Sequence, residues 1–143
     1  MQEALSQARK AAERGEVPIG AVIVRESEII ARAYNLREIE EDPTAHAEIL
    51  ALQKAAHELG SWRLEGCTIY VTLEPCPMCA GAIQQARLDR LVYGADDPKS
   101  GAVRSLYSIP ADERLNHQVQ IEAGICGDES SRLLREFFDS LRD

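Results

Sequence analysis

The chain has 143 residues, of which 45% are hydrophobic and 28% charged, a composition typical of a globular protein with a core of its own. Its formal net charge of -8 argues mildly against a nucleic-acid partner, because phosphate binding usually leaves a basic footprint. The longest aliphatic run, residues 19–24, is far shorter than the roughly 20 apolar residues of a membrane span, and the first residues contain no apolar signal segment. We therefore expect a single soluble, cytoplasmic domain over residues 1–143, with no membrane partner.

The first part of the chain predicts a helix, a hairpin and a second helix. Apolar residues at helical spacing indicate a helix over residues 2–14. Two β-rich runs around a short turn, 18–26 and 28–34, favour a β-hairpin. Thr44 is a residue type that caps helices, and the apolar face that follows it predicts a helix over 45–58.

The second part predicts strands that alternate with helices. The expected elements are a strand over 68–74, a helix over 77–87, a strand over 90–95, a functional loop over 96–105, a strand over 117–124 and a helix over 128–141. This order indicates an α/β fold in which helices cover a mixed sheet. We interpret Phe137 and Phe138 of the last helix as part of a core face, and Trp62 as a core residue.

Two cysteines separated by two residues, Cys76 and Cys79, stand where a strand ends and a helix begins. This spacing alone is typical of a redox pair, a structural zinc site or a catalytic metal site. A structural site requires two more ligands at matching spacing, but Cys67 and Cys126 stand alone and are expected to be small buried residues. His46 opens another predicted helix, and three ligands with one open position define a catalytic zinc site.

Glu48 follows His46 by two residues. Residues two apart on a regular helix point about 200° away from each other, so we expect Glu48 to be a base beside the metal and not a fourth ligand. Two thiolates cancel the charge of zinc, so its water needs a neighbouring base. A redox pair would leave His46 and Glu48 unexplained, and the remaining histidines, His57 and His117, are interpreted as surface or packing residues.

The segment from His46 to Glu48, followed by the segment from Pro75 to Cys79, forms the H-x-E…P-C-x-x-C signature of zinc nucleobase deaminases. Five blocks of sequence resemble the bacterial tRNA-specific adenosine deaminases of the cytidine/deoxycytidylate deaminase superfamily and cover residues 15 to 125 almost end to end. They are "GEVPIGAVIV", "DPTAHAEI", "VTLEPCPMCAGA", "YGADDPKSGA" and "LNHQVQIEAGI".

The resemblance implies a three-layer α/β/α cytidine-deaminase-like fold with a mixed five-stranded sheet. It implies a homodimer with one Zn²⁺ per subunit that converts adenosine to inosine at the wobble position of a tRNA anticodon stem-loop. By match of motif, His46, Cys76 and Cys79 hold the zinc, and Glu48 moves protons between the water, the ring and the leaving ammonia.

The resemblance also implies contacts with the nucleotide. By match of position, Asn35 binds the flipped nucleotide, Val17 and Ala47 line its pocket, and Asp97 and Lys99 lie in a loop that touches the neighbouring nucleotides. The chain departs from the family pattern in three ways, one of which is an N-terminal helix that starts a few residues late. Arg104 stands where glycine is usual, and the last residues, "FFDSLRD", lack the usual basic stretch.

Two alternatives remain open at this point. A small-molecule deaminase, for guanine or a nucleoside, shares the zinc motif, although the "DPKSGA" and "LNHQ" segments resemble the tRNA enzymes. A zinc-stabilised structural or binding module is the second alternative, and it leaves Glu48 without a role. An RNA enzyme of charge -8 must concentrate its positive charge locally, and the candidates are Arg87, Arg90, Lys99, Arg104, Arg132, Arg135 and Arg142.

Overall fold

A computed structural model describes residues 1–142. Its helices are α1 (Gln2–Glu13), α2 (Ala47–Leu59), α3 (Pro77–Gln85) and α4 (Gly127–Ser140), and its strands are β1 (Gly20–Arg25), β2 (Glu28–Tyr34), β3 (Cys67–Leu73), β4 (Arg90–Ala95) and β5 (Gln120–Glu122). The predicted order of helices and strands is confirmed. Among the helices of residues 1–142, none combines the length and apolar character that crossing a bilayer requires.

The five strands form one mixed sheet, as predicted, and their order in it is β2-β1-β3-β4-β5. The hairpin β1–β2 and the pair β1–β3 are antiparallel, whereas β3, β4 and β5 run parallel. The parallel pair β3–β4 needs a crossover, which α3 supplies. Because β3 is the central strand, its residues Ile69 and Val71 are fully buried. This burial explains the continuous apolar run in the sequence.

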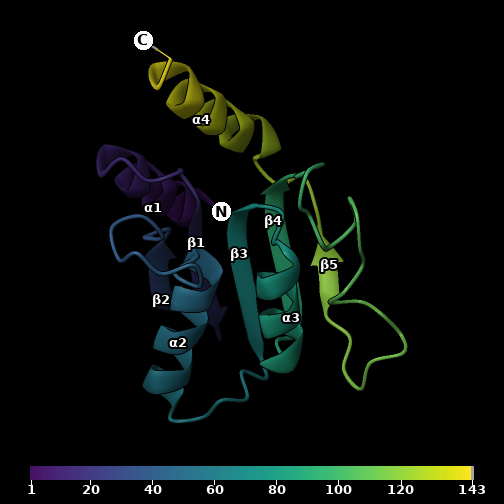
Figure 1. Ribbon diagram of the computed structural model, residues 1–143. Helices are drawn as coiled ribbons and strands as arrows, with labels where there is room; N and C mark the ends of the chain where they lie inside the picture. The colour runs from purple at the N-terminus through teal and green to yellow at the C-terminus, as the bar shows by residue number, and fades with distance from the viewer. Residues whose placement is uncertain (143) are drawn as a thin grey trace.

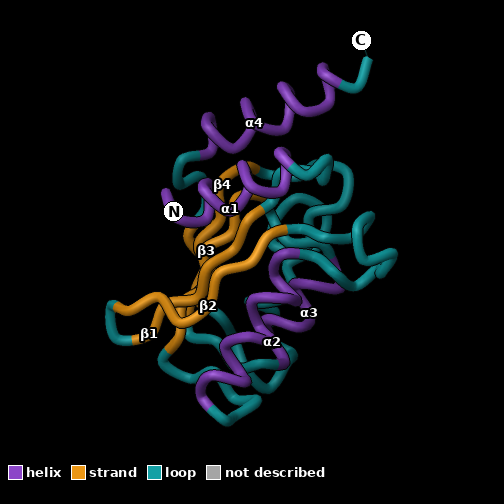
Figure 2. The backbone as a smooth tube through the Cα atoms, turned by 90° about the vertical axis from the view of Figure 1, so that its left-hand side faces the viewer, coloured by secondary structure: helices purple, strands orange, loops and turns teal. Residues whose placement is uncertain are grey.

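Helices cover both faces of the sheet (Figures 1 and 2), which confirms the three-layer fold. Helices α2 and α3 lie side by side on one face, and α1 packs on the other face against β1 and β2. Helix α4 begins beside β4 and then extends beyond the sheet. Both α2 and α3 begin at the same edge of the sheet, so their first residues face each other there.

The interpretation of the last helix and of Trp62 as core elements is wrong. Phe138 of α4 is 46% exposed and Leu141, directly after the helix, is 66% exposed, whereas Ser130 is the residue of that helix that is buried. Trp62 is 56% exposed because it lies in the turn after α2, where its ring contacts the guanidinium groups of Arg63 and Arg87.

Three local predictions also need correction. Thr44 does not cap α2, because its hydroxyl and amide both donate to Asp42, and the N-cap residue is His46. The last strand is only three residues long, since β5 pairs with β4 over Arg90–Val92 alone. Cys126 is only half-buried, whereas Cys67 is buried as predicted.

The other two histidines have the roles that the sequence predicts. His57 is exposed. His117 packs against the chain, with its Nε2 atom 2.7 Å from the carbonyl oxygen of Leu88. Neither histidine joins the group of candidate metal ligands.

Close packing of α1 on β1 requires glycine at position 20. A Cβ atom there would lie 2.1 Å from the carbonyl oxygen of Ala4 and 2.5 Å from the amide nitrogen of Ala8. These are backbone atoms, so the strain can be relieved only by moving the helix away from the sheet.

We therefore predict that Gly20→Ala lowers the free energy of unfolding by about 3 kcal/mol. The matched control is Gly60→Ala, where φ is 64° and no atom lies within 4 Å of the added Cβ. That variant carries only the backbone strain, about 1 kcal/mol. Urea denaturation measures both, and equal losses in the two variants would contradict the packing argument.

Candidate active site

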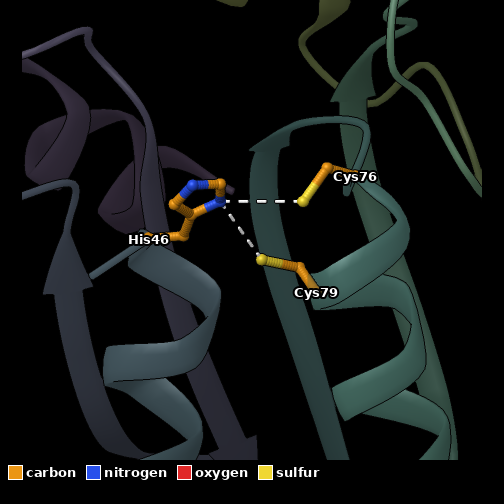
Figure 3. A group of neighbouring side chains, drawn as sticks. All are labelled: His46, Cys76 and Cys79. Atoms are coloured by element: carbon orange, nitrogen blue, oxygen red, sulfur yellow. Dashed lines mark hydrogen bonds between the residues drawn. The ribbon is translucent and has the colours of Figure 1, made fainter. Parts of the chain in front are cut away.

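Three side chains that can bind a metal meet where α2 and α3 begin (Figure 3). The Nδ1 atom of His46 lies 3.7 Å from the Sγ atom of Cys76 and 3.4 Å from that of Cys79. His46 is the N-cap residue of α2, and Cys76 is the N-cap residue of α3, with Pro77 in the first turn. The predicted convergence of two helix starts is therefore present in the structure.

The geometry of this group fits a tetrahedral zinc ion. With zinc bonds of about 2.3 Å to sulfur and 2.0–2.1 Å to nitrogen, tetrahedral coordination places nitrogen and sulfur about 3.6 Å apart. The distances from His46 to the two sulfurs lie on either side of that value. Within residues 1–142, this is the single group of three or more His, Cys, Asp or Glu side chains whose donor atoms all lie within 4.8 Å of one another.

The two thiols differ in acidity because they interact with each other. The hydrogen bond from Cys79 and the contact with His46 lower the pKa of the Cys76 thiol to about 4, against the opposing effect of burial. The same interaction with Cys76, together with burial, raises the pKa of the Cys79 thiol. One thiolate is thus available before any cation arrives, and binding of a cation displaces the second proton.

Glu48 lies in the first turn of α2 and is 4% exposed. It lines the same cavity as His46 and Cys76 but is not one of the three clustered donors. Burial raises the pKa of its carboxyl to about 7. A carboxyl group with that proton affinity is suited to accepting and returning a proton near neutral pH.

A small cavity of about 80 Å³ opens beside the histidine. It brings together the three residues that the sequence assigned to the nucleotide pocket: Val17, Asn35 and Ala47. The amide of Asn35 is fixed by two hydrogen bonds, because its Nδ2 atom donates to the carbonyl oxygen of Val17 at 3.3 Å and its Oδ1 atom accepts from the amide of Arg37 at 3.1 Å. Asn35 is 5% exposed.

A larger cavity of about 680 Å³ shares His46 and Val17 with the small one. Asp97 and Lys99, the two predicted loop residues, line this cavity together with residues of α4. The side chain of Asp97 is hydrogen-bonded within its own loop, because its Oδ1 atom accepts from the amides of Lys99 and Ser100. Lys99 is exposed.

Most of the arginine candidates for RNA contact are engaged within the protein. Arg90 pairs with Glu122, Arg142 pairs with Asp139, and Arg87 lies over Trp62. Arg104, the departure from the family pattern, makes two hydrogen bonds with the carboxylate of Asp96, at 2.9 and 2.8 Å. Lys99 and Arg135 are the candidates that line the large cavity.

Two buried carboxylates hold the loops of the site, and the sequence interpretation missed both. Glu16 is 1% exposed and accepts hydrogen bonds from the amides of Glu38 and Ile39, in the segment that leads to His46. Glu74 is 2% exposed and accepts hydrogen bonds from residues 97–105. The signal that marks Glu74 is an acid placed between a strand without charged residues and a proline.

Ionisation of Glu74 is stabilised by these donors. Burial alone raises the pKa of its carboxyl, but hydrogen bonds from Arg104, Ser105 and Asp97 outweigh burial and lower that pKa below its usual value. Their amides bind the charged form, so the loop and the carboxylate stabilise each other.

Residues 1–142 match the family model of MafB19-like deaminases. Together with the mixed sheet and the His-Cys-Cys group beside a buried glutamate, this match defines the chain as a deaminase with a cytidine-deaminase-like fold. A structure from a study of A-to-I editing by tRNA:A34 deaminases superposes with a TM-score of 0.90, is 48% identical, and aligns 94% of this chain with 97% of that one.

The family is identified by relatives that align with nearly the whole chain. The tRNA-specific adenosine deaminase of Bacillus subtilis is 53% identical over 99% of this chain and 88% of its own length, and that of Aquifex aeolicus is 48% identical over 98% and 92%. The chain therefore belongs to the family of tRNA-specific adenosine deaminases. A guanine deaminase from Nitrosomonas europaea is more distant, with a TM-score of 0.78 and 25% identity over 95% of this chain and 81% of that one.

The donor geometry predicts that Cys76→Ser abolishes zinc binding, because a serine hydroxyl does not replace a thiolate ligand. Elemental analysis of the purified protein should give about one zinc per chain for the parent and close to none for the variant. Cys126→Ser, which changes a cysteine outside the group, should keep the metal. Zinc retained at full stoichiometry by Cys76→Ser would contradict the assignment of this site.

Proposed function

We propose that this chain catalyses the hydrolytic deamination of adenosine to inosine at the wobble position of a tRNA anticodon. The observation that carries the proposal is the meeting of a metal-binding group, a buried glutamate and a narrow pocket around one point, residues His46, Glu48 and Asn35. We take the substrate from the names of relatives that are about 50% identical over the whole chain. We further propose that the chain acts in the cytoplasm and as a single domain.

In this proposal His46, Cys76 and Cys79 hold one zinc ion, which supplies a water of lowered pKa at the pocket. Glu48 takes a first proton from the attacking water and delivers it to the ring nitrogen, and it then carries a second proton, from the new hydroxyl group, to the amine, which leaves as ammonia. Its burial supports this role, since a carboxyl group held near neutral pKa can both accept and release the proton.

Asn35 orients the nucleotide in this proposal. Its amide is already held by Val17 and Arg37, so its remaining hydrogen-bonding capacity is fixed in direction before the substrate arrives. Val17 and Ala47 provide apolar walls for the flipped base. A cavity of about 80 Å³ accepts part of a base only, so the sugar and the flanking nucleotides lie in the larger cavity.

The larger cavity reconciles an acidic chain with an RNA substrate. Three basic side chains line it, Arg37, Lys99 and Arg135, and Phe138 offers an exposed ring beside them. The cavity is also lined by four acidic side chains, of which Glu74 and Asp96 are already bonded within the protein. Positive charge and an aromatic surface are what a single-stranded RNA segment requires. With so few phosphate contacts, the salt dependence corresponds to the release of about two to four counterions.

We also propose that the chain forms a homodimer through the face made by α2 and α3. That face carries an apolar groove of about 360 Å³, lined by Ile49, Leu52, Gln53, Ala56, Trp62, Leu64, Ala82, Gln85 and Ala86. Small residues on α3, with open space around Gly81, allow a second helix to approach closely. An exposed tryptophan at the rim of an apolar groove is typical of a protein interface.

The test of the function compares three substrates: an anticodon stem-loop, free adenosine and free guanine. Mass spectrometry should detect conversion of adenine to hypoxanthine in the stem-loop at the wobble position. Glu48→Gln should retain its zinc and lose about a thousandfold in turnover, because the proton carrier is gone. Preferred turnover of guanine would favour a small-molecule deaminase, and zinc binding without any turnover would favour a structural module.

The dimer proposal predicts a mass of two chains by sedimentation velocity at micromolar concentration. Ala82→Glu, which places a charge in the groove, should yield monomers because a charge buried at an interface is costly. Ser6→Glu on α1, at the opposite face of the sheet, is the matched control and should stay dimeric. A parent protein that sediments as a monomer would overturn this proposal.

A further inference from the structure

The loop formed by residues 97–105 is fastened to a single buried side chain. Its amides at Val103, Arg104 and Ser105 donate to the Oε2 atom of Glu74, at 2.9–3.0 Å. At its other end, the amide of Asp97 donates to the Oε1 atom at 2.9 Å. The Ser105 hydroxyl donates to the same oxygen from the 103–105 end. Both ends of the loop are thus held by one carboxylate.

The loop also closes tightly around this carboxylate. A Cβ atom at Gly101 would lie 2.3 Å from the carboxyl carbon of Glu74, so only glycine allows the backbone to approach so closely. The amide of Ala102 donates to the carbonyl oxygen of Pro75 at 2.8 Å. The loop is therefore packed on the segment from Glu74 to Pro75, which leads directly into Cys76.

Residues 97–100 of this loop line the large cavity that Glu48 and His46 also line. The position of Lys99 relative to the candidate metal ligands is thus set through the Asp97 amide, Glu74 and Pro75. We infer that Glu74 is a positioning residue, which holds the 97–105 loop in place for the nucleotides that flank the target adenosine. This inference rests on the proposed function for its substrate.

The two oxygens of Glu74 accept from different donors. Glu74→Gln should therefore break one of these hydrogen bonds and keep the others. With its amide nitrogen at the Oε1 position, glutamine donates to the Ser105 hydroxyl and keeps the three amides on its oxygen. Only the amide of Asp97 then loses its acceptor. In this variant residues 97–100, which line the cavity, should be released, while residues 103–105 stay bound to the side chain at position 74. Ser105→Ala is the matched control, because it removes one bond to Glu74 and leaves all four amide bonds in place.

The first measurement is hydrogen exchange, which needs no substrate. In Glu74→Gln the amide of Asp97 should exchange faster by about tenfold or more, and the amides of Val103 and Arg104 should keep their protection. In Ser105→Ala the amide of Asp97 should keep the exchange rate of the parent protein. Unchanged exchange at Asp97 in Glu74→Gln would overturn the inference, whatever the substrate proves to be.

The second measurement is kinetic, on zinc-loaded protein. Glu74→Gln should raise KM for the stem-loop by about tenfold, at nearly unchanged kcat and zinc content, and should turn over free adenosine like the parent protein. Equal losses on stem-loop and adenosine would overturn the inference in favour of a general structural role. Absence of stem-loop turnover in the parent protein would instead overturn the proposed function and leave the exchange result standing.

A double-mutant cycle adds a third readout. If Glu74 acts by placing Lys99, then Lys99→Ala should raise KM for the stem-loop by a smaller factor in the Glu74→Gln background than in the parent protein. Lys10→Ala on α1, which removes the same charge outside both cavities, should have no effect in either background. Additive losses for Glu74→Gln and Lys99→Ala would overturn the coupling.

If Glu74→Gln does not fold, Gly101→Ala displaces the same carboxylate and should give the same kinetic signature.

Discussion

The candidate site depends on two helices that begin next to each other at one edge of the sheet. His46 and Cys76 are separated by thirty positions, and each is an N-cap residue with an extended backbone, at φ -76°, ψ 151° and φ -74°, ψ 174°. An extended N-cap directs its side chain past the helix end and not around its flank. This is why Glu48, two residues further along α2, can approach the same centre as His46. Helix α2 follows β2 and α3 follows β3, so the strand order β2-β1-β3 brings the two helix starts to the same end of the sheet.

The same edge of the sheet gathers the loops that complete the site. The segment after β2 is held by Glu16 and by the side chain of Asn35, and the segment after β4 is held by Glu74. Each anchor is a buried polar group whose hydrogen bonds are satisfied by backbone amides of a loop. Two buried carboxylates and one buried amide therefore anchor the loops around the cavities.

The order of the elements could be predicted because apolar periodicity and turn residues act locally. The errors arise where the outcome depends on which of several neighbours a side chain contacts. The apolar row of α4 was correctly assigned to a helix, but periodicity does not reveal what covers that row, and Phe138 remains exposed. Thr44 has the chemistry of a cap, yet Asp42 binds its hydroxyl and amide first. Both failures concern competition between partners that the sequence alone does not rank.

The metal group could be predicted because its residues lie in two short motifs whose spacing follows from helix geometry. The anchoring role of Glu74 could not be predicted, since its donors come from positions 23 to 31 residues further along the chain. Arg104 is a similar case. Its partner Asp96 is eight residues away, and nothing in the local pattern shows that this arginine is occupied within the protein.

The exposed Trp62 has a practical consequence for spectroscopy. It is the only tryptophan of the chain, and it lies just beyond the carboxyl end of α2, about 20 Å along that helix from the metal group at its start. Fluorescence excited at the red edge of indole absorption therefore arises from one defined point on the α2–α3 face. Its emission colour and quenching report the solvation of that face, and events in the nucleotide cavities at the opposite end of the helix leave the signal largely unchanged.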